Sequence, residues 1–261
     1  MSASGRQPDP GLGIFETLLV VGGEPVELEA HLARLRTSLA DLYGAELPAD
    51  AAERARAVAA ESKLGRLRLT AVPDGAGLEL EVRVRPVDPR IMFPSPENGA
   101  RLRTTSRPGG HGPYKWVDRT GMDRPETGAG QLICDGEELL EAGWANLFAV
   151  REGTLWTPAA DGRILPGMAR AAIQEIAREE GVAAREGPLR RDDLLAAQEV
   201  FLTNSVRGVE PAIELDGAPL PGTGPLSRRL AAALRQRWGL PDAAGGPAAP
   251  ADAQIADQLS R

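Results

Sequence analysis

Apolar and polar positions in the first part of the chain follow two different periods. Residues 14–21 form an apolar run, the turn signal GGEP follows, and together with residues 26–28 this pattern predicts a β-hairpin. Over residues 29–44 the spacing changes, because leucines recur every three or four positions, which is typical of a helix, and Gly44 ends it. The chain therefore begins with a strand pair followed by a helix.

The next segments repeat the same two periods. Residues 51–62 are rich in alanine and predict a second helix. Residues 66–72 and 78–87 alternate apolar and charged side chains and meet at PDGAG, which predicts a second hairpin. The first hundred residues thus predict a small unit of helices packed on an antiparallel sheet.

The pattern in the second part of the chain predicts many short strands and few helices. Helices are predicted over 168–181, behind Pro166 and Gly167, and over 227–239. Strands are predicted at the following positions: 131–135, 144–150, 154–158, 199–205 and 212–217. No G-x-G-x-x-G follows a strand, so the pattern favours a barrel-like sheet over a dinucleotide-binding fold.

The domain organisation follows from a Gly/Pro-rich connector at 104–113. We expect an α+β protein with a small domain over 1–106 and a larger barrel-like domain over 107–241. Residues 242–261 are rich in Ala, Gly and Pro, and this composition predicts a disordered tail.

Composition narrows the functional classes. A net charge of −7 argues against a nucleic-acid partner, and no apolar run is long enough to span a bilayer. The N-terminus has no secretory signal pattern, so we expect a cytoplasmic protein without a membrane partner. The chain has one cysteine, Cys134, and two histidines, which are too few soft and imidazole ligands for a typical metal site, so no metal is expected.

Lys115 is the first candidate for chemistry, and it lies just after the Gly/Pro-rich connector. The chain holds 30 Lys and Arg residues, and nearly all of them are arginine. An arginine could supply charge at this position, but only a lysine supplies an amine that loses its proton and forms a Schiff base with an aldehyde. The alternative is a surface lysine at a loop junction, and the general arginine content of the chain weakens any argument from lysine scarcity.

Glu141 is the second candidate, because it lies in an otherwise apolar and small-residue run with Asn146 five positions later. A buried carboxylate needs a partner, since an unpaired one is costly. A protonated pyridine nitrogen would be a suitable partner. The alternative is a carboxylate beside solvent that caps a turn.

Three further elements could hold anions. LPGMAR, residues 165–170, opens a helix and presents free backbone N–H groups at its positive end. TNSVRGVEP, residues 203–211, is a polar turn after a strand, and Arg34 lies between Leu32 and Leu35. Each element also has an ordinary structural explanation. Together with one amine and one carboxylate they match the aldehyde, pyridine and phosphate of pyridoxal 5′-phosphate.

The order of these motifs resembles the fold-type IV pyridoxal-phosphate enzymes, the class IV aminotransferase family that also includes 4-amino-4-deoxychorismate lyase. The resemblance runs from about residue 12 to about residue 217. The motifs appear in this order: FETL, HLARL, the lysine, E-x-x-x-x-N-L-F, TP, LPGMAR and TNSVRGVEP. It implies two domains, a small N-terminal one and a larger pseudo-barrel one, and a homodimer with the active site between the domains.

Carried over by motif, the resemblance implies the following roles. Lys115 holds the cofactor and Glu141 pairs with its pyridine nitrogen. The phosphate is held by Arg34, by backbone N–H groups of Met168 and Ala169, and by the Ser205 hydroxyl. The substrate is a small amine or amino acid.

The reaction stays open between two outcomes that share their first half. Arg119 follows the lysine by four positions, a K-x-x-x-R pattern that looks more like the lyases, so we favour 4-amino-4-deoxychorismate lyase, which forms 4-aminobenzoate and pyruvate. The alternative is a transaminase acting on D-amino acids, branched-chain L-amino acids or (R)-amines with a keto acid. A further alternative is a non-catalytic binding domain. Arg107, Arg119 and Arg207 are candidates for the substrate carboxylate.

Overall fold

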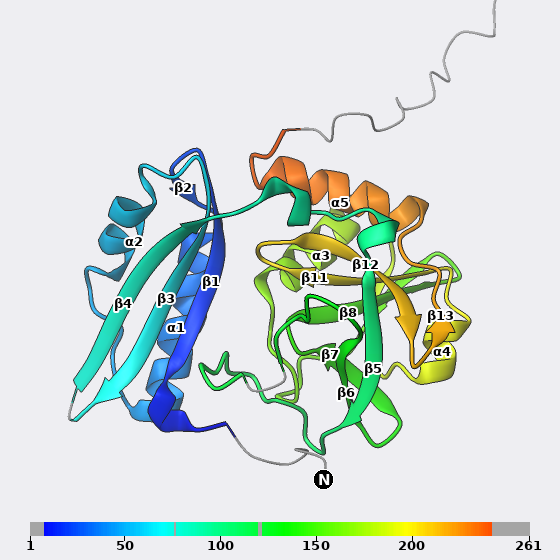
Figure 1. The fold of residues 1–261 in the computed structure, drawn as a ribbon, viewed down its shortest axis with the longest axis horizontal. Helices are drawn as coiled ribbons and strands as arrows, with labels where there is room; N and C mark the ends of the chain where they lie inside the picture. The colour runs from blue at the N-terminus through cyan, green and yellow to red at the C-terminus, as the bar shows by residue number, and fades with distance from the viewer. Residues whose placement is uncertain (1–7, 76, 120–121, 242–261) are drawn as a thin grey trace, which may run out of the picture.

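The computed structural model describes residues 8–75, 77–119 and 122–241, which form two β-sheets with helices packed on them (Figure 1). The tail predicted to be disordered, 242–261, lies outside the described residues. Helices and strands occur in both halves of the chain, so the predicted α+β class is confirmed. No helix among the described residues is both long and apolar enough to cross a bilayer.

The first sheet has four strands in the order β2-β1-β3-β4. Its strands have the following bounds: β1 Ile14–Val21, β2 Glu24–Pro25, β3 Leu64–Asp74 and β4 Gly77–Pro86. All of its pairings are antiparallel, as the two predicted hairpins require. The hairpin β1–β2 is tighter than predicted, because Gly22 and Gly23 adopt positive φ angles and make a two-residue turn, so the return strand already begins at Glu24.

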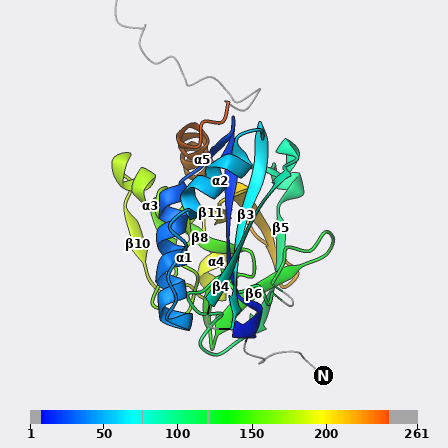
Figure 2. The ribbon, with the colours of Figure 1, turned by 90° about the vertical axis from the view of Figure 1, so that its left-hand side faces the viewer.

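Two helices pack on this sheet, α1 (Leu28–Tyr43) and α2 (Ala51–Ala59). Figure 2 views the molecule from this side and shows α1 running alongside the strands. The leucines that predicted α1 face inward, and Leu32, Leu35 and Leu39 are buried against the sheet. Gly44 ends α1 in a left-handed conformation that glycine adopts without steric cost.

The second sheet closes on itself. Around the ring the order is β8-β11-β12-β5-β6-β7, and β7 pairs back to β8, so these strands form a barrel, as predicted. The barrel strands have the following bounds: β5 Ala100–Ser106, β6 Gly130–Asp135, β7 Glu138–Ala142, β8 Ala145–Arg151, β11 Glu199–Asn204 and β12 Gly208–Leu215. The strands outside the ring are β9 Thr154–Thr157, β10 Ala184–Glu186 and β13 Ala218–Pro219.

Helices α3 (Met168–Glu179) and α5 (Pro225–Arg237) pack on the barrel and on each other, and the short helix α4 covers Arg191–Leu195. A stacked pair of barrel residues, Phe148 and Phe201, lies in the same apolar core, with ring centroids 5.1 Å apart. The core beneath α3 and α5 therefore fixes the N-terminal end of α3 against the barrel.

The predicted connector 104–113 begins later in the structure, because β5 extends to Ser106. Backbone pairing of β5 with β12 and β6 explains the difference, since it extends a strand into a segment whose sequence resembles a loop. The change from the first sheet to the second falls between β4 and β5. The division into domains at 106 and 107 stays a prediction.

Candidate active site

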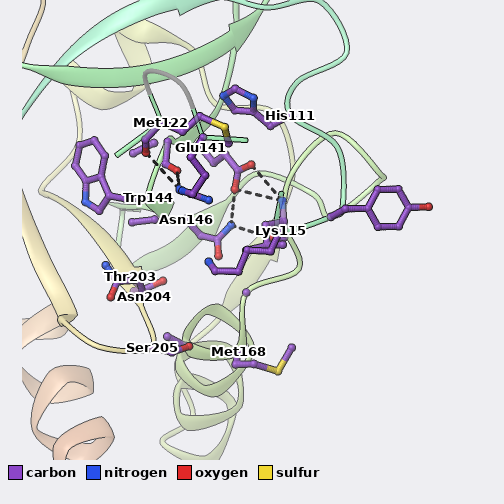
Figure 3. A pocket seen from close by; sticks show the side chains of 18 of the residues that line it. His111, Lys115, Met122, Glu141, Trp144, Asn146, Met168, Thr203, Asn204 and Ser205 are labelled. Atoms are coloured by element: carbon purple, nitrogen blue, oxygen red, sulfur yellow. Dashed lines mark hydrogen bonds between the residues drawn. The ribbon is translucent and has the colours of Figure 1, made fainter. Parts of the chain in front are cut away.

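A pocket between the first sheet and the barrel collects side chains from distant parts of the chain (Figure 3). Most of the predicted site residues line it: Arg34, Lys115, Arg119, Glu141, Met168, Ala169 and Ser205. Arg107 and Arg207 are not among the described residues that line this pocket. The motifs that the sequence spreads over more than 170 positions thus converge on one place.

Lys115 is held by the edge of β1 rather than by an element of its own. The Lys115 carbonyl accepts a hydrogen bond from the Phe15 N–H at 2.9 Å, and the Val117 N–H donates to the Gly13 carbonyl at 3.0 Å. These bonds add the lysine segment to the first sheet as a short strand-like extension. The lysine is therefore positioned by the N-terminal unit although it reaches the barrel pocket.

The surroundings of Lys115 favour a neutral amine. Burial, with the Arg119 and Arg34 cations nearby, lowers the pKa of Lys115 to about 7. The amine also lies 5.1 Å from the centre of the Phe15 ring. A large fraction of Lys115 is consequently unprotonated near neutral pH, which is the state that attacks a carbonyl.

Glu141 and Asn146 lie opposite each other on the β7–β8 hairpin, whose turn is formed by Gly143 and Trp144. The five-residue spacing noted in the sequence is therefore the signature of a two-residue hairpin turn. Asn146 Nδ2 and the Leu165 N–H both donate to the Glu141 carboxylate, at 3.2 Å each.

Glu141 is buried, with 5% of its surface exposed. Burial raises the pKa of Glu141 to about 8, against smaller opposing effects of the Leu165 N–H and Lys115. Within the described part of the chain no salt-bridge partner of Glu141 lies within 4.0 Å. Such a carboxylate fits a protonated ring nitrogen, which would supply the missing cation.

The start of α3 forms the opposite part of the pocket. Gly167 is its N-cap and makes no side-chain capping bond, and the first turn holds no acidic residue. Met168 and Ala169 line the pocket directly behind it. An uncapped helix start facing a pocket suits an anion such as a phosphate. Gly167 is also required sterically, since a Cβ there would approach Asn146 Oδ1 to 2.0 Å.

The end of β11 and the turn after it bring Thr203, Asn204 and Ser205 to the same pocket. Asn204 Oδ1 accepts from the backbone N–H groups of Val206 and Arg207 at 3.0 and 2.8 Å, so this side chain shapes the turn. The Thr203 hydroxyl is buried and has no hydrogen-bond partner in the described structure. It therefore keeps a donor and an acceptor for a group placed in the pocket.

Arg34 reaches the pocket from α1 and connects the two units. Its Nε and Nη2 donate to the two carboxylate oxygens of Glu16 at 2.7 Å each, and Nη1 donates to the Pro166 carbonyl at 2.7 Å. His31 Nδ1 lies 2.8 Å from the same carboxylate. Burial alone would raise the pKa of Glu16, but the Arg34 guanidinium and the His31 hydrogen bond outweigh it and lower the value to about 2.

Arg119 is the predicted substrate arginine that the structure places in the pocket. Its Nη2 donates to the carbonyls of Gly143 and Met122, and its Nε contacts Asp123. The guanidinium lies 5.4 Å from the centre of the Phe15 ring. These contacts fix Arg119 beside Lys115 and beside the turn of the β7–β8 hairpin.

The other two predicted arginines bind elsewhere. Arg107 Nε donates to the Gly110 carbonyl at 3.0 Å. Arg207 binds the fully buried Glu210, which also accepts hydrogen bonds from Arg124 and Trp144. Arginine is frequent throughout the chain, so the sequence could not tell which of the three lies in the pocket.

Sequence reasoning missed Glu16, His31, Trp144 and His111. Glu16 carried a signal, because it is a carboxylate inside the apolar run 14–21, the same signal that singled out Glu141. His111 was overlooked within the Gly-rich connector. Trp144 occupies the hairpin turn and lines the pocket, a position that depends on the closure of the barrel.

The pocket brings together a lysine, a buried carboxylate and an uncapped helix start in a protein of two sheets. This combination is typical of the fold-type IV pyridoxal-phosphate enzymes. The family model for class IV aminotransferases matches residues 13–118 and 87–215. The chain belongs to the class IV aminotransferase family. These enzymes depend on pyridoxal 5′-phosphate, so the predicted cofactor is confirmed at the level of the family.

Among curated relatives, the D-alanine aminotransferase of Listeria monocytogenes is 32% identical over 101 residues, which are 38% of this chain and 35% of that protein. The chain thus spans about a third of the length of the curated relatives it matches.

Two solved structures cover most of the chain. A hypothetical aminotransferase from Mycobacterium tuberculosis in a pyridoxal-phosphate-bound form has a TM-score of 0.77 and 26% identity, covering 91% of this chain and 94% of that one. The 4-amino-4-deoxychorismate lyase of Pseudomonas aeruginosa has a TM-score of 0.73 and 28% identity, covering 90% and 96%. The chain is therefore similar both to a hypothetical aminotransferase and to a lyase.

Proposed function

We propose that the protein is a pyridoxal-phosphate-dependent lyase that converts 4-amino-4-deoxychorismate to 4-aminobenzoate and pyruvate. The observation that carries this proposal is Arg119, which follows Lys115 in a lyase-like K-x-x-x-R pattern and lines the pocket beside it. The similarity to the Pseudomonas aeruginosa lyase over 90% of the chain supports it.

The residues of the pocket suit this cofactor. Bound there, pyridoxal phosphate supplies an aldehyde for the substrate amine and a ring that takes up the electrons released at the substrate Cα. Lys115 Nζ would hold the aldehyde and, once freed by the substrate amine, accept the Cα proton. Glu141 would keep the ring nitrogen protonated, because with a pKa raised to about 8 this buried acid needs a further cation beside it to ionise fully near neutral pH.

The phosphate would be held at the start of α3. The N–H groups of Met168 and Ala169 and the Ser205 hydroxyl surround this part of the pocket. Arg34 has used three of its N–H groups on Glu16 and Pro166, and its two remaining N–H groups are available for a phosphate oxygen. Arg119 would pair with a substrate carboxylate.

A transaminase is the second candidate, because the Listeria relative is a D-alanine aminotransferase and the Mycobacterium tuberculosis structure is that of a hypothetical aminotransferase. The candidate substrates are D-amino acids, branched-chain L-amino acids and (R)-amines, each with a keto acid. The two functions share Lys115, Glu141 and the phosphate seat, which is formed by the start of α3 with Ser205 and Arg34. They differ in what happens to the substrate after its Cα proton is removed.

The proposal is tested first by the cofactor. Purified protein supplied with pyridoxal phosphate should show an absorbance band at the edge of the visible range that borohydride bleaches, and the Lys115→Ala variant should lack it. A colourless wild-type protein would reject both enzyme functions and leave a non-catalytic binding domain.

The reaction is tested second. The holoenzyme is given 4-amino-4-deoxychorismate and pyruvate release is followed with lactate dehydrogenase; in parallel it is given D-alanine, L-leucine or an (R)-amine with 2-oxoglutarate. Release of pyruvate together with 4-aminobenzoate supports the lyase. Amino-group transfer without pyruvate release from 4-amino-4-deoxychorismate rejects the lyase in favour of the transaminase.

Two further expectations, one from the family resemblance and one from the N-terminal sequence, remain predictions. A homodimer is expected, and light scattering coupled to gel filtration measures it directly. The cytoplasmic location is also a prediction.

A further inference from the structure

His111 is a buried side chain in the same pocket that the proposed chemistry does not use. It is 7% exposed and lines the pocket together with Lys115, Arg119 and Glu141 (Figure 3). Neither of its ring nitrogens has a hydrogen-bond partner among the described residues. Buried polar atoms without partners are rare, and in a pocket they mark the place where a ligand or a water binds.

A loop of glycines fixes this histidine. Gly109, Gly110 and Gly112 all have positive φ angles, and the loop is anchored by the Gly112 N–H to the Arg163 carbonyl at 3.3 Å. A Cβ at Gly110 would approach that carbonyl oxygen to 2.0 Å. The Gly-rich stretch around His111 is therefore a close-fitting support for the imidazole as well as a connector.

Arg107 strengthens the support from the other side. Its carbonyl accepts the Gly110 N–H at 2.9 Å, and its Nε donates to the Gly110 carbonyl at 3.0 Å. Arg107, one of the three arginines predicted to bind the substrate, thus binds the loop that carries His111. It also places a cation near the imidazole without entering the pocket.

The imidazole is neutral at ordinary pH. Burial, with the Arg107 and Arg119 cations, lowers the pKa of His111 to about 4. A neutral imidazole offers one N–H donor and one acceptor nitrogen. The positive potential of the two arginines favours an anionic group at the donor.

We propose that His111 is a substrate-binding residue whose ring N–H donates to a carboxylate oxygen of the substrate, next to Arg119. This inference rests on the proposed function, because it requires a carboxylate-bearing substrate in the pocket of Lys115. It is carried by the burial, the two unpartnered nitrogens, the shared pocket and the glycine support. In this arrangement Arg119 supplies the positive charge that pairs with the carboxylate, and the hydrogen bond from His111 orients it.

The test uses the holoenzyme and three unreactive or product carboxylates: 4-aminobenzoate, glutarate and 2-oxoglutarate. Each is titrated against the wild type by absorbance or calorimetry, and the tightest binder is then measured on His111→Leu, His111→Asn and His111→Gln. We expect His111→Leu to weaken binding by about tenfold or more, the scale of one lost hydrogen bond to a charged group. Asn places a donor near Nδ1 and Gln places one near Nε2, so one of them should recover most of the affinity.

The same variants should separate substrate binding from chemistry. We expect KM to rise with a small change in kcat, and the cofactor band to remain. Unchanged carboxylate affinity and unchanged KM in His111→Leu would overturn the inference, as would a wild-type holoenzyme that binds none of the three carboxylates. Loss of the cofactor band in all three variants would also overturn it, because His111 would then support the cofactor site instead.

A matched pair of glycine variants tests the support. Gly109→Ala and Gly110→Ala both introduce a side chain at a positive φ, but only the Cβ at position 110 meets a backbone atom, since among the described residues no atom beyond its chain neighbours lies within 4 Å of a Cβ at position 109. We expect Gly110→Ala to raise KM as His111→Leu does and Gly109→Ala to leave it within about twofold. Equal effects of the two variants would contradict a positioning role for the loop.

Failure of the inference and failure of the proposed function are distinguishable. A wild-type protein without a cofactor band, or without activity on any substrate pair, fails the proposed function. An active, coloured wild type whose carboxylate affinity does not depend on His111 fails only the inference.

Discussion

Arg34 donates to both carboxylate oxygens of Glu16 at 2.7 Å, and this pair ties α1 to β1 at the pocket that Arg34 lines. Glu16 is 2% exposed, and the Arg34 side chain is 9% exposed. The geometry is bidentate, so it fixes the plane of the guanidinium as well as its position. The N–H group that reaches the Pro166 carbonyl is thereby held at the turn before α3.

We predict that Glu16→Gln loosens the cofactor site. The change leaves the Arg34 cation buried without its carboxylate, and we expect a loss of about 3 kcal/mol in the free energy of unfolding. Pyridoxal-phosphate affinity should fall by about tenfold, because Arg34 loses its orientation. Urea unfolding and a cofactor titration measure the two effects.

The control for this variant is Glu29→Gln, which breaks the ion pair of Glu29 with Arg56. Both partners are largely exposed, at 71% and 53%, so the loss should stay below about 1 kcal/mol. Similar losses in Glu16→Gln and Glu29→Gln would show that burial of the Glu16 pair contributes nothing.

The protonation of Lys115 gives a second prediction, made for the cofactor-free protein. Its pKa of about 7 means that the amine reacts as a free base from neutral pH upward, whereas an ordinary lysine requires pH values near 10.5. The Lys63→Arg variant leaves Lys115 as the only lysine, so an amine-reactive reagent followed by peptide mass spectrometry measures its rate alone. We expect the labelling rate to reach half its maximum near pH 7.

Adding Arg119→Gln should move that midpoint to higher pH, because Arg119 is the largest charge effect that lowers the pKa of Lys115. A midpoint that stays near 10.5 in the Lys63→Arg protein would contradict the burial of the amine. A midpoint near 7 that Arg119→Gln leaves unchanged would assign the shift to burial and Arg34 instead of Arg119.

Glu141 gives a further prediction, because its pKa is shifted upward whereas that of Lys115 is shifted downward. Its pKa is raised to about 8 in the folded protein against 4.5 as the ordinary value, so between these values the folded cofactor-free state binds one proton more than the unfolded state. This group's contribution to stability is fully present below pH 4.5 and falls as the pH rises to 8. The total loss is on the order of 5 kcal/mol.

Glu141→Gln removes that dependence, since glutamine does not titrate. We expect the cofactor-free variant to gain stability over the wild type as the pH rises from 5 to about 8.5, measured by urea unfolding at each pH. Glu137→Gln is the control, because Glu137 is 84% exposed and its replacement should leave the pH profile unchanged. Parallel profiles for wild type and Glu141→Gln would show that the carboxylate is not desolvated.

Gly167 gives a steric prediction at the phosphate seat. A Cβ there would lie 2.0 Å from Asn146 Oδ1, so Gly167→Ala must displace either the start of α3 or the Asn146 side chain. That side chain donates to Glu141 and to the Leu165 carbonyl. We expect a loss of about 1–3 kcal/mol in stability and weaker binding of pyridoxal phosphate. Gly77→Ala is the control, since its Cβ would meet its nearest atom at an ordinary 3.6 Å. Unchanged cofactor affinity in Gly167→Ala would separate this glycine from the phosphate seat.

Local patterns predicted the elements well because their signals lie within a few residues. The leucines of α1, the alternation in β3 and β4, and Pro166–Gly167 before α3 each depend on neighbours in the chain. The barrel was suggested by many short strands, but its closure between β7 and β8 follows from pairing alone. The strand β5 was partly mistaken for a connector because its partners come from distant segments.

The candidate site divides in the same way. Lys115 and Glu141 were predicted, since a reactive amine and a buried carboxylate are chemically unusual wherever they occur. Glu16 carried the same sequence signal as Glu141, but its role depends on the contact with Arg34, which spans 18 positions. His111 required the packing of the glycine loop on Arg163, which no local pattern encodes.

The two arginines Arg119 and Arg207 give the last prediction. The sequence made both of them candidates for the substrate carboxylate, but the structure places them differently. Arg119 lines the pocket, while Arg207 binds Glu210 outside it. We expect Arg119→Gln to lower kcat/KM by about a hundredfold or more, the scale of a lost charge-assisted pair with a substrate carboxylate. Arg207→Gln should keep kcat/KM within about threefold and instead cost about 2 kcal/mol of stability, because Glu210 is fully buried and keeps Arg124 as a partner. Steady-state kinetics and urea unfolding of both variants decide the matter, and an Arg207→Gln protein that folds normally but loses activity would move the substrate carboxylate away from Arg119.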